Sequence, residues 1–289
     1  MRNRPIAALI YDFDKTLSPK DMQEYGFLPG IGIEPDVFWE ACRSFAMRNQ
    51  TDGVLAYMFM MQHHARDCAP LTRSSLQALG ENIEFFAGVD SWFERVNVFG
   101  KSLGVDVEHY IISSGVREII EGTPIAQHFK AVFAASFVFD ERGIAIWPAT
   151  AVNYTSKTQY LFRINKGILD PTNDVDLNRF TPEHERRVPF PNMIYVGDGL
   201  TDVPCMKMTR LKGGRSIAVY QHNNTQIADH LLLQSRADFA VPADYSAGSP
   251  IENTVFATLD RIRAQYVCDA LHYHQLDLAR DRTGIDDFE

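Results

Sequence analysis

Two carboxylates one residue apart follow an apolar run near the start of the chain. The run, residues 6–11, has the length and composition of a strand buried on both faces of a parallel sheet. Asp12 and Asp14 come next, and the hydroxyl of Thr16 follows two residues later. Residues i and i+2 lie on the same side of an extended segment, and two acids held together either share a proton or need a cation. This spacing predicts a divalent-metal site, a nucleophile paired with an acid/base, or both, whereas a strand that runs into an acidic turn would also give these residues.

Further polar groups stand at the predicted ends of strands or starts of helices. Ser113 and Ser114 end an apolar stretch, and their hydroxyls, together with the amides of a helix start, suit an oxyanion. Lys157 begins a predicted helix, while Asp198 and Asp202 follow a short apolar strand. In open α/β sheets, ligands bind at the carboxyl ends of the strands. We therefore expect these groups to converge with the first two acids on one anion-and-metal site.

The elements that must position these groups alternate along the chain. We expect strands at residues 6–11, 108–112, 131–135, 193–196, 216–220 and 239–241. Helices are predicted at residues 91–103, 116–121, 155–167, 224–233 and 250–276, with a short one ending at 208, a hairpin at 136–148 and a polar surface excursion at 170–191. The pattern predicts an α/β fold built on a doubly wound parallel sheet.

A helical stretch interrupts this alternation after the first strand. A connector with several glycines and prolines, residues 18–34, leads to predicted helices at 35–47, 52–66 and 72–80. This stretch is too long for a loop between two strands. We therefore expect a catalytic core of residues 1–17 and 88–289, with a helical domain of residues 18–87 inserted into it.

Composition narrows the class of protein. The chain has 289 residues, 45% of them apolar, and a formal net charge of −9, which argues against nonspecific binding of nucleic acid or of anionic membranes. No apolar stretch approaches membrane-spanning length, and the N-terminus does not read as a signal peptide. Four scattered cysteines without a CxxC pair predict reduced thiols rather than a disulfide framework or a zinc site. We expect a cytoplasmic protein, and the oligomeric state stays open.

The strings around these polar groups resemble the motifs of the haloacid dehalogenase (HAD) superfamily, specifically its phosphoserine-phosphatase-like branch with a helical cap. The matching strings are Asp-Phe-Asp-Lys-Thr-Leu at 12–17, Ile-Ile-Ser-Ser-Gly at 111–115 and Gly-Asp-Gly-Leu-Thr-Asp at 197–202, with one lysine between them. Lys157 and Lys166 compete for the lysine role. We prefer Lys157, because it begins its helix and can face the strand ends, whereas Lys166 lies in the last turn, where a cation favours the helix dipole.

The resemblance implies a role for each of these side chains. Asp12 would be the nucleophile that forms an aspartyl-phosphate, and Asp14 would protonate the leaving alcohol and then deprotonate the hydrolytic water. Mg²⁺ would be bound by the carboxylates of Asp12 and Asp198 and by the backbone carbonyl of Asp14, with Asp202 orienting the metal's waters or the lysine. The phosphoryl oxygens would be held by Thr16, Ser113, Ser114 and Lys157.

The resemblance also implies a small phosphorylated metabolite as substrate, because a cap that closes over a site favours small molecules. A phosphotransferase or a nucleotidase on the same scaffold is the alternative enzyme, and a noncatalytic binding module is the alternative from another class. Several side chains of the helical stretch are candidates for contacting the substrate and determining specificity, and none is preferred over the others: Arg43, Arg48, Tyr57, His63 and Arg66. Glu24 stands where some family members place a contact to a substrate amine.

Overall fold

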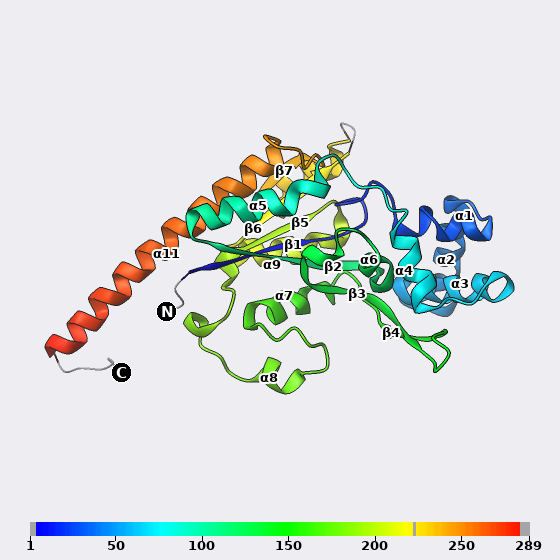
Figure 1. Cartoon of the computed structure of the whole chain (residues 1–289), viewed down its shortest axis with the longest axis horizontal. Helices are drawn as coiled ribbons and strands as arrows, with labels where there is room; N and C mark the ends of the chain where they lie inside the picture. The colour runs from blue at the N-terminus through cyan, green and yellow to red at the C-terminus, as the bar shows by residue number, and fades with distance from the viewer. Residues whose placement is uncertain (1–3, 222–223, 284–289) are drawn as a thin grey trace.

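The computed structural model describes residues 4–221 and 224–283, without the side chains of Asp67, Cys68 and His184. The described residues form a seven-stranded sheet in the order β4-β3-β2-β1-β5-β6-β7 (Figure 1). All neighbouring strands pair in parallel except β3 and β4, which form an antiparallel hairpin. The strands are β1 (Ile6–Tyr11), β2 (Asp106–Val116), β3 (Phe129–Phe139), β4 (Ala145–Thr150), β5 (Met193–Gly197), β6 (Arg215–Tyr220) and β7 (Phe239–Pro242). The predicted doubly wound parallel sheet is confirmed.

Helices cover both faces of this sheet because the central strand β1 is apolar on both sides. Ala7, Leu9 and Tyr11 belong to one buried cluster, and Ala8 and Ile10 belong to another, as the two-residue period of a strand requires. The first cluster includes side chains from α5 (Val89–Leu103), α6 (Arg117–Glu121) and α11 (Pro250–Thr283). The second includes side chains from α7 (Lys157–Lys166), α9 (Val203–Leu211) and α10 (Gln226–Leu233).

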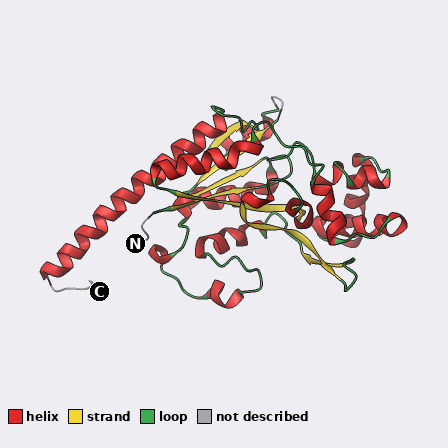
Figure 2. Cartoon of the chain, in the orientation of Figure 1, coloured by secondary structure: helices red, strands yellow, loops and turns green. Residues whose placement is uncertain are grey.

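The chain between β1 and α5 is helical and gathers at one end of the sheet, at the right of Figure 1, with no strand among its elements in Figure 2. It comprises η1 (Met22–Glu24), α1 (Phe27–Ile31), α2 (Pro35–Asn49), α3 (Gly53–Cys68) and α4 (Arg73–Gly80). The three predicted helices are therefore confirmed. The connector expected at 18–34 was predicted as a loop, and that was wrong for η1 and α1, whose few residues carry too little periodicity to be recognised.

This helical stretch packs closely against the rest of the chain at two places, the end of α6 and the β3–β4 hairpin. A Cβ atom added to Gly122, just after α6, would lie 1.9 Å from the carbonyl oxygen of Gln77 in α4, so the crossing requires glycine. The hairpin is the second place, since Thr72 and Ile144 form an antiparallel bridge. Gln62 also donates from α3 to the carbonyl of Ala145 at 2.8 Å.

Other boundaries differ from expectation. Helix α11 runs to Thr283 instead of ending near residue 276, since no glycine or proline interrupts it before Gly284. Strand β2 extends through Gly115, which was expected in a turn. The excursion at 170–191 contains short helices: α8 (Asp174–Asn178), η3 (Glu183–Glu185) and the start of η4 (Phe190–Asn192). Two further 3₁₀ helices connect core elements: η2 (Ala126–His128) lies between α6 and β3, and η5 (Leu200–Asp202) lies between β5 and α9.

The described residues also bear on membranes and thiols. Among them, no helix combines the length and the apolar character that crossing a bilayer requires. Cys42, Cys205 and Cys268 are free cysteines. The side chain of the fourth cysteine, Cys68, lies outside the described part of the structure.

Candidate active site

Two neighbouring parallel strands end at the same edge of the sheet and bring distant acids together. Tyr11, the last residue of β1, pairs with Val196 near the end of β5, and the amide of Asp12 continues the ladder by donating to the carbonyl of Val196 at 2.9 Å. Asp12, Asp198 and Asp202 each offer an oxygen atom, and these three atoms lie within 4.8 Å of one another. The structure thus places acids from the beginning of the chain and from beyond its middle in one cluster, which we call the three-acid cluster.

A buried lysine ties two members of this cluster together. The ammonium of Lys157 lies 2.8 Å from Asp12 Oδ2 and 2.8 Å from Asp202 Oδ1. Burial opposes the charge of Lys157, but the two carboxylates outweigh it and raise the pKa of the ammonium. The ammonium of Lys166 instead bonds to the carbonyls of Leu177 and Arg179 in the excursion. Of the two competing lysines, the structure therefore brings Lys157 to the acids.

One side chain that the motifs did not indicate also contacts Asp202. The hydroxyl of Tyr195, in the middle of β5, donates to Asp202 Oδ1 at 2.8 Å, so this oxygen accepts from both Tyr195 and Lys157. Burial and the charge of Asp202 raise the pKa of Tyr195 well above its ordinary value, which keeps the hydroxyl a donor. A buried tyrosine needs a partner for its hydroxyl, and a tyrosine inside a short apolar strand was the only signal in the sequence.

The three-acid cluster carries more negative charge than Lys157 neutralises. Burial raises the pKa of Asp198 to about 8, and the charges of Asp202 and Asp12 add to the shift. Burial and then Asp202 likewise raise the pKa of Asp12 to about 6, against the opposing effect of Lys157. Asp202 Oδ2 is buried without a hydrogen-bond partner among the described residues. Carboxylate oxygens are the ligands that Mg²⁺ prefers, so the donor set and the surplus charge fit a divalent cation.

Asp14 lies beside this cluster in a different environment. Its Oδ1 accepts from the amide of Met22 at 2.8 Å, and a Cβ atom added to Gly115 would lie 2.9 Å from its Oδ2. Burial, and then the charges of Asp21 and Asp12, raise the pKa of Asp14 well above its ordinary value. A carboxyl group whose pKa is raised holds its proton more readily and is better suited to donating it. Asp21, which sequence reasoning missed, also pairs with Lys15 at 2.8 Å.

Buried hydroxyls stand next to the acids in the sequence and at the end of β2. Thr16 Oγ1 and Ser114 Oγ are buried and have no hydrogen-bond partner among the described residues. Ser113 Oγ accepts from the amide of Gly115 at 3.0 Å. Leaving a buried hydroxyl without a partner costs free energy. Each of these two hydroxyls therefore has a donor that no described residue uses.

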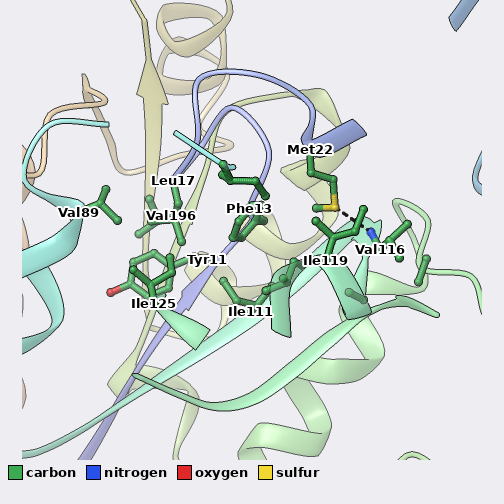
Figure 3. Close-up of a cluster of buried hydrophobic side chains, with 14 of the residues drawn as sticks. Tyr11, Phe13, Leu17, Met22, Val89, Ile111, Val116, Ile119, Ile125 and Val196 are labelled. Atoms are coloured by element: carbon green, nitrogen blue, oxygen red, sulfur yellow. Dashed lines mark hydrogen bonds between the residues drawn. The ribbon is translucent and has the colours of Figure 1, made fainter. Parts of the chain in front are cut away.

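The loop that carries Asp14 is held by apolar packing, which Figure 3 shows. Its side chains lie in one buried cluster with residues of β2 and α6: Phe13, Leu17, Met22, Ile111, Val116 and Ile119. The amide of Val116 also donates to the sulfur of Met22 at 3.1 Å, the contact dashed in Figure 3. Packing thus joins the loop after β1 to the end of β2, where the serines lie.

The candidates for substrate contact in the helical stretch differ in whether they contact residues outside their own helix. Tyr57 is buried, and its hydroxyl donates to the carbonyl of Ser114 at 2.6 Å. Glu24 accepts from the indole of Trp39 at 3.3 Å, and its pKa is raised by burial and by Asp21. The others contact their own helices or solvent: Arg43 pairs with Glu40, Arg48 bonds to the carbonyl of Ser44, His63 stacks on Phe59, and Arg66 is exposed.

Comparisons with known proteins agree with this arrangement at the level of the fold. No protein-family model matches the chain. An uncharacterized protein from Borreliella burgdorferi is 27% identical over 277 residues, which cover 86% of this chain and 95% of that protein. A HAD-family hydrolase from Salmonella enterica serovar Typhi is similar in structure, with a TM-score of 0.53, 14% identity, and coverage of 83% of this chain and 69% of that one.

Two phosphoserine phosphatase structures are similar in the same way. A substrate-bound phosphoserine phosphatase has a TM-score of 0.53 and 14% identity, and covers 82% of this chain and 93% of that one. A probable phosphoserine phosphatase from Vibrio cholerae has a TM-score of 0.54 and 13% identity, with coverage of 92% and 69%. The chain thus has the fold of HAD-family hydrolases and phosphoserine phosphatases, as the resemblance predicted.

Proposed function

We propose, from the fold shared with phosphoserine phosphatases, that this chain is a Mg²⁺-dependent phosphomonoesterase acting through an aspartyl-phosphate. The observation that carries the proposal is the convergence of Asp12, Asp198, Asp202 and Lys157 at the ends of β1 and β5. A strand that merely ran into an acidic turn would give no reason for acids so distant in sequence to meet around a buried lysine.

The reaction follows from the two acids after β1. A carboxylate oxygen of Asp12 forms a bond to phosphorus while the bond to the leaving alcohol oxygen breaks, and Asp14 gives that oxygen a proton. Water then attacks the phosphorus of the aspartyl-phosphate and gives a proton to the carboxylate of Asp14, while the bond between Asp12 and phosphorus breaks and inorganic phosphate leaves. The raised pKa of Asp14 supports this role, because the group must hold a proton before the first step.

The remaining side chains bind and orient the phosphoryl group. Mg²⁺ would be held by the carboxylates of Asp12 and Asp198 and the backbone carbonyl of Asp14, and when bound it reduces the repulsion between the nucleophile and a phosphate dianion. Asp202 would hold Lys157 toward Asp12, consistent with the two contacts of 2.8 Å. Thr16, Ser113, Ser114 and Lys157 would donate to the phosphoryl oxygens.

The helical stretch would serve as a cap. In this proposal residues 18–87 cover a core formed by residues 1–17 and 88–289, and a small phosphorylated metabolite is enclosed between them. Tyr57 supports the arrangement, because it reaches from α3 to the carbonyl of Ser114. We propose a cytoplasmic enzyme, and the net charge of −9 argues against nonspecific binding of nucleic acid or of an anionic membrane.

A panel of small phosphate monoesters, assayed for phosphate release with and without Mg²⁺, tests the proposal. We expect Mg²⁺-stimulated hydrolysis that is lost in Asp12→Asn while the circular dichroism spectrum is unchanged. Lys157→Met should be inactive and the matched Lys166→Met active. Near-normal activity of Asp12→Asn would refute the proposed nucleophile. No stimulated hydrolysis across the panel would favour a noncatalytic module, and phosphoryl transfer to an added alcohol would favour a phosphotransferase.

A further inference from the structure

A cavity of about 410 Å³ lies away from the three-acid cluster. It is lined by Arg215 at the start of β6, by Phe239 at the start of β7 and by one face of α11 that includes Ala257, Thr258 and Arg261. Arg215 pairs with Ile194 of β5, four residues before Asp198. A strand rises about 3.3 Å per residue, so the cavity begins about 13 Å from the acids, toward the N-terminal ends of the parallel strands.

Arginines are the charged residues that line this cavity. Within residues 4–221 and 224–283, neither Arg215 nor Arg261 forms an ion pair, although the chain has an excess of acids. Asp238 influences Arg261 but is already engaged, since it accepts from Arg210 at 3.1 Å and from the amide of Ser216 at 2.9 Å. Two like charges therefore share a partly buried space with no ion pair of their own, and their mutual repulsion is unfavourable until an anion enters.

Each of the two guanidinium groups donates a hydrogen bond to a backbone carbonyl, which limits its movement. Arg261 donates to the carbonyl of Pro191 at 2.5 Å, and Arg215 donates to the carbonyl of Gly214 at 3.1 Å. Each bond uses one terminal nitrogen of a group that carries five N–H donors. A planar guanidinium with free donors matches the oxygens of a carboxylate or a phosphate, and a group fixed beforehand loses less entropy on binding.

The rest of the lining mixes apolar groups with polar side chains that are bonded within α11 or to the residues just before it: Asn253 donates to the carbonyl of Gly248 and Thr254 to that of Pro250. Phe239 presents an aromatic ring and Ala257 a methyl group. The hydroxyl of Thr258 donates to the carbonyl of Thr254 at 2.8 Å within α11, so it is not available as a donor to a ligand. The cavity thus combines two guanidinium groups with apolar side chains, and this combination suits an anion that carries an apolar group.

We propose that this cavity binds a small organic anion, a phosphate or a carboxylate attached to an apolar group, at a site separate from the three-acid cluster. The anionic oxygens lie between Arg215 and Arg261, and the apolar group contacts Phe239 and Ala257. Binding here does not depend on the proposed hydrolysis, because it involves none of the residues assigned to that reaction.

Isothermal titration calorimetry of the full chain in EDTA tests the site. Phenylphosphonate and benzoate are the probes, because they share an apolar ring and differ in the anionic group, and benzyl alcohol is the uncharged control. Without metal, the surplus negative charge of the three-acid cluster disfavours anion binding there. We expect saturable one-site binding of at least one anion and none of benzyl alcohol, and the tighter probe distinguishes a phosphate site from a carboxylate site.

Variants locate the binding. Arg215→Gln removes one guanidinium group and should weaken the affinity for the anionic probe by at least about tenfold. This is the loss expected when one partner of a charged hydrogen-bonded pair is removed. Ala257→Glu, at an exposed helix position, supplies an internal carboxylate and should abolish binding while the melting temperature changes little. Arg263→Gln, on the same helix but outside the cavity lining, should bind as the natural chain does. No saturable binding, or binding that persists in both Arg215→Gln and Ala257→Glu, would overturn the proposal.

Discussion

Replacing Tyr195 with phenylalanine tests whether the geometry around Asp202 matters for catalysis. The substitution keeps the ring and removes one hydrogen bond of 2.8 Å to a buried carboxylate. Bonds to charged groups contribute about 1.5–3 kcal/mol. Lys157 still bonds to the same oxygen, so Asp202 keeps a partner and we expect the lower end of that range, about 1.5 kcal/mol.

This energy predicts a split between two kinetic constants. Tyr195 donates to Asp202 and is not among the groups proposed to hold the phosphoryl oxygens, so KM should stay within about twofold of its normal value. If the lost energy is needed to hold Asp202 and Lys157 in position, kcat should fall about tenfold, since 1.4 kcal/mol corresponds to one factor of ten. Affinity for Mn²⁺, measured by electron paramagnetic resonance without substrate, should weaken as well, because Asp202 belongs to the three-acid cluster.

The matched control is Tyr160→Phe. Tyr160 lies on α7, three residues after Lys157; it is buried, and its ring stacks on Phe133. This variant should keep both kcat and Mn²⁺ affinity. If Tyr195→Phe also keeps both, then Asp202 does not need the tyrosine and the reasoning is refuted. If both variants lose kcat together with equal losses of stability, the effect is one of packing.

Three other predictions follow from the same structure. The raised pKa values of Asp12 (about 6) and Asp198 (about 8) mean that these carboxyl groups bind more protons in the folded, metal-free chain than in the unfolded chain, whereas burial lowers the pKa of His109 to about 3 and acts in the opposite sense below its ordinary value of 6.5; the urea midpoint should therefore fall as pH rises from about 6.5 to 8 and recover with Mg²⁺ at pH 8. Gly122→Ala should lower the unfolding free energy by about 1–3 kcal/mol in urea melts, because its Cβ atom meets the carbonyl of Gln77; an unchanged midpoint would contradict the close crossing. Asp14→Asn should slow hydrolysis of alkyl phosphates far more than that of aryl phosphates, whose leaving groups need no proton, and equal losses for both would argue against the acid role.

Much of the fold could be predicted because its signals are local. The apolar strands and the alternation with helices follow from periodicity, and parallel strands end at one edge of the sheet, which is why Asp12 and Asp198 were expected to meet. The choice between Lys157 and Lys166 also rested on a local property, the position of each lysine within its helix. The structure places the first beside the acids and the second in the excursion.

The rest depends on contacts between residues far apart in the sequence. The bond from Tyr195 to Asp202 requires the turn after β5 to fold back under the strand, and an apolar strand with one tyrosine does not reveal this. Gly122 was unremarkable in the sequence, because a glycine near a helix end is usually a cap. The crossing with Gln77 is a tertiary requirement that no local pattern carries. Likewise, Arg215 and Arg261 are distant in the chain and meet only through the cavity.

The electrostatics of the three-acid cluster differ from those of an ordinary acidic turn. Acids in turns are exposed and titrate normally, whereas Asp12 and Asp198 are held where burial and mutual repulsion raise their pKa values. Lys157 balances only one of the charges that the three acids can carry, so the folded chain holds an unfavourable concentration of charge at this edge of the sheet once Asp198 ionises, at about pH 8. Such a cost is expected where a site must bind a cation and an anion together, because the groups that destabilise the empty site are those that bind its ligands. The recovery of stability by Mg²⁺ at pH 8 is therefore the most direct measure of whether these acids were brought together for binding.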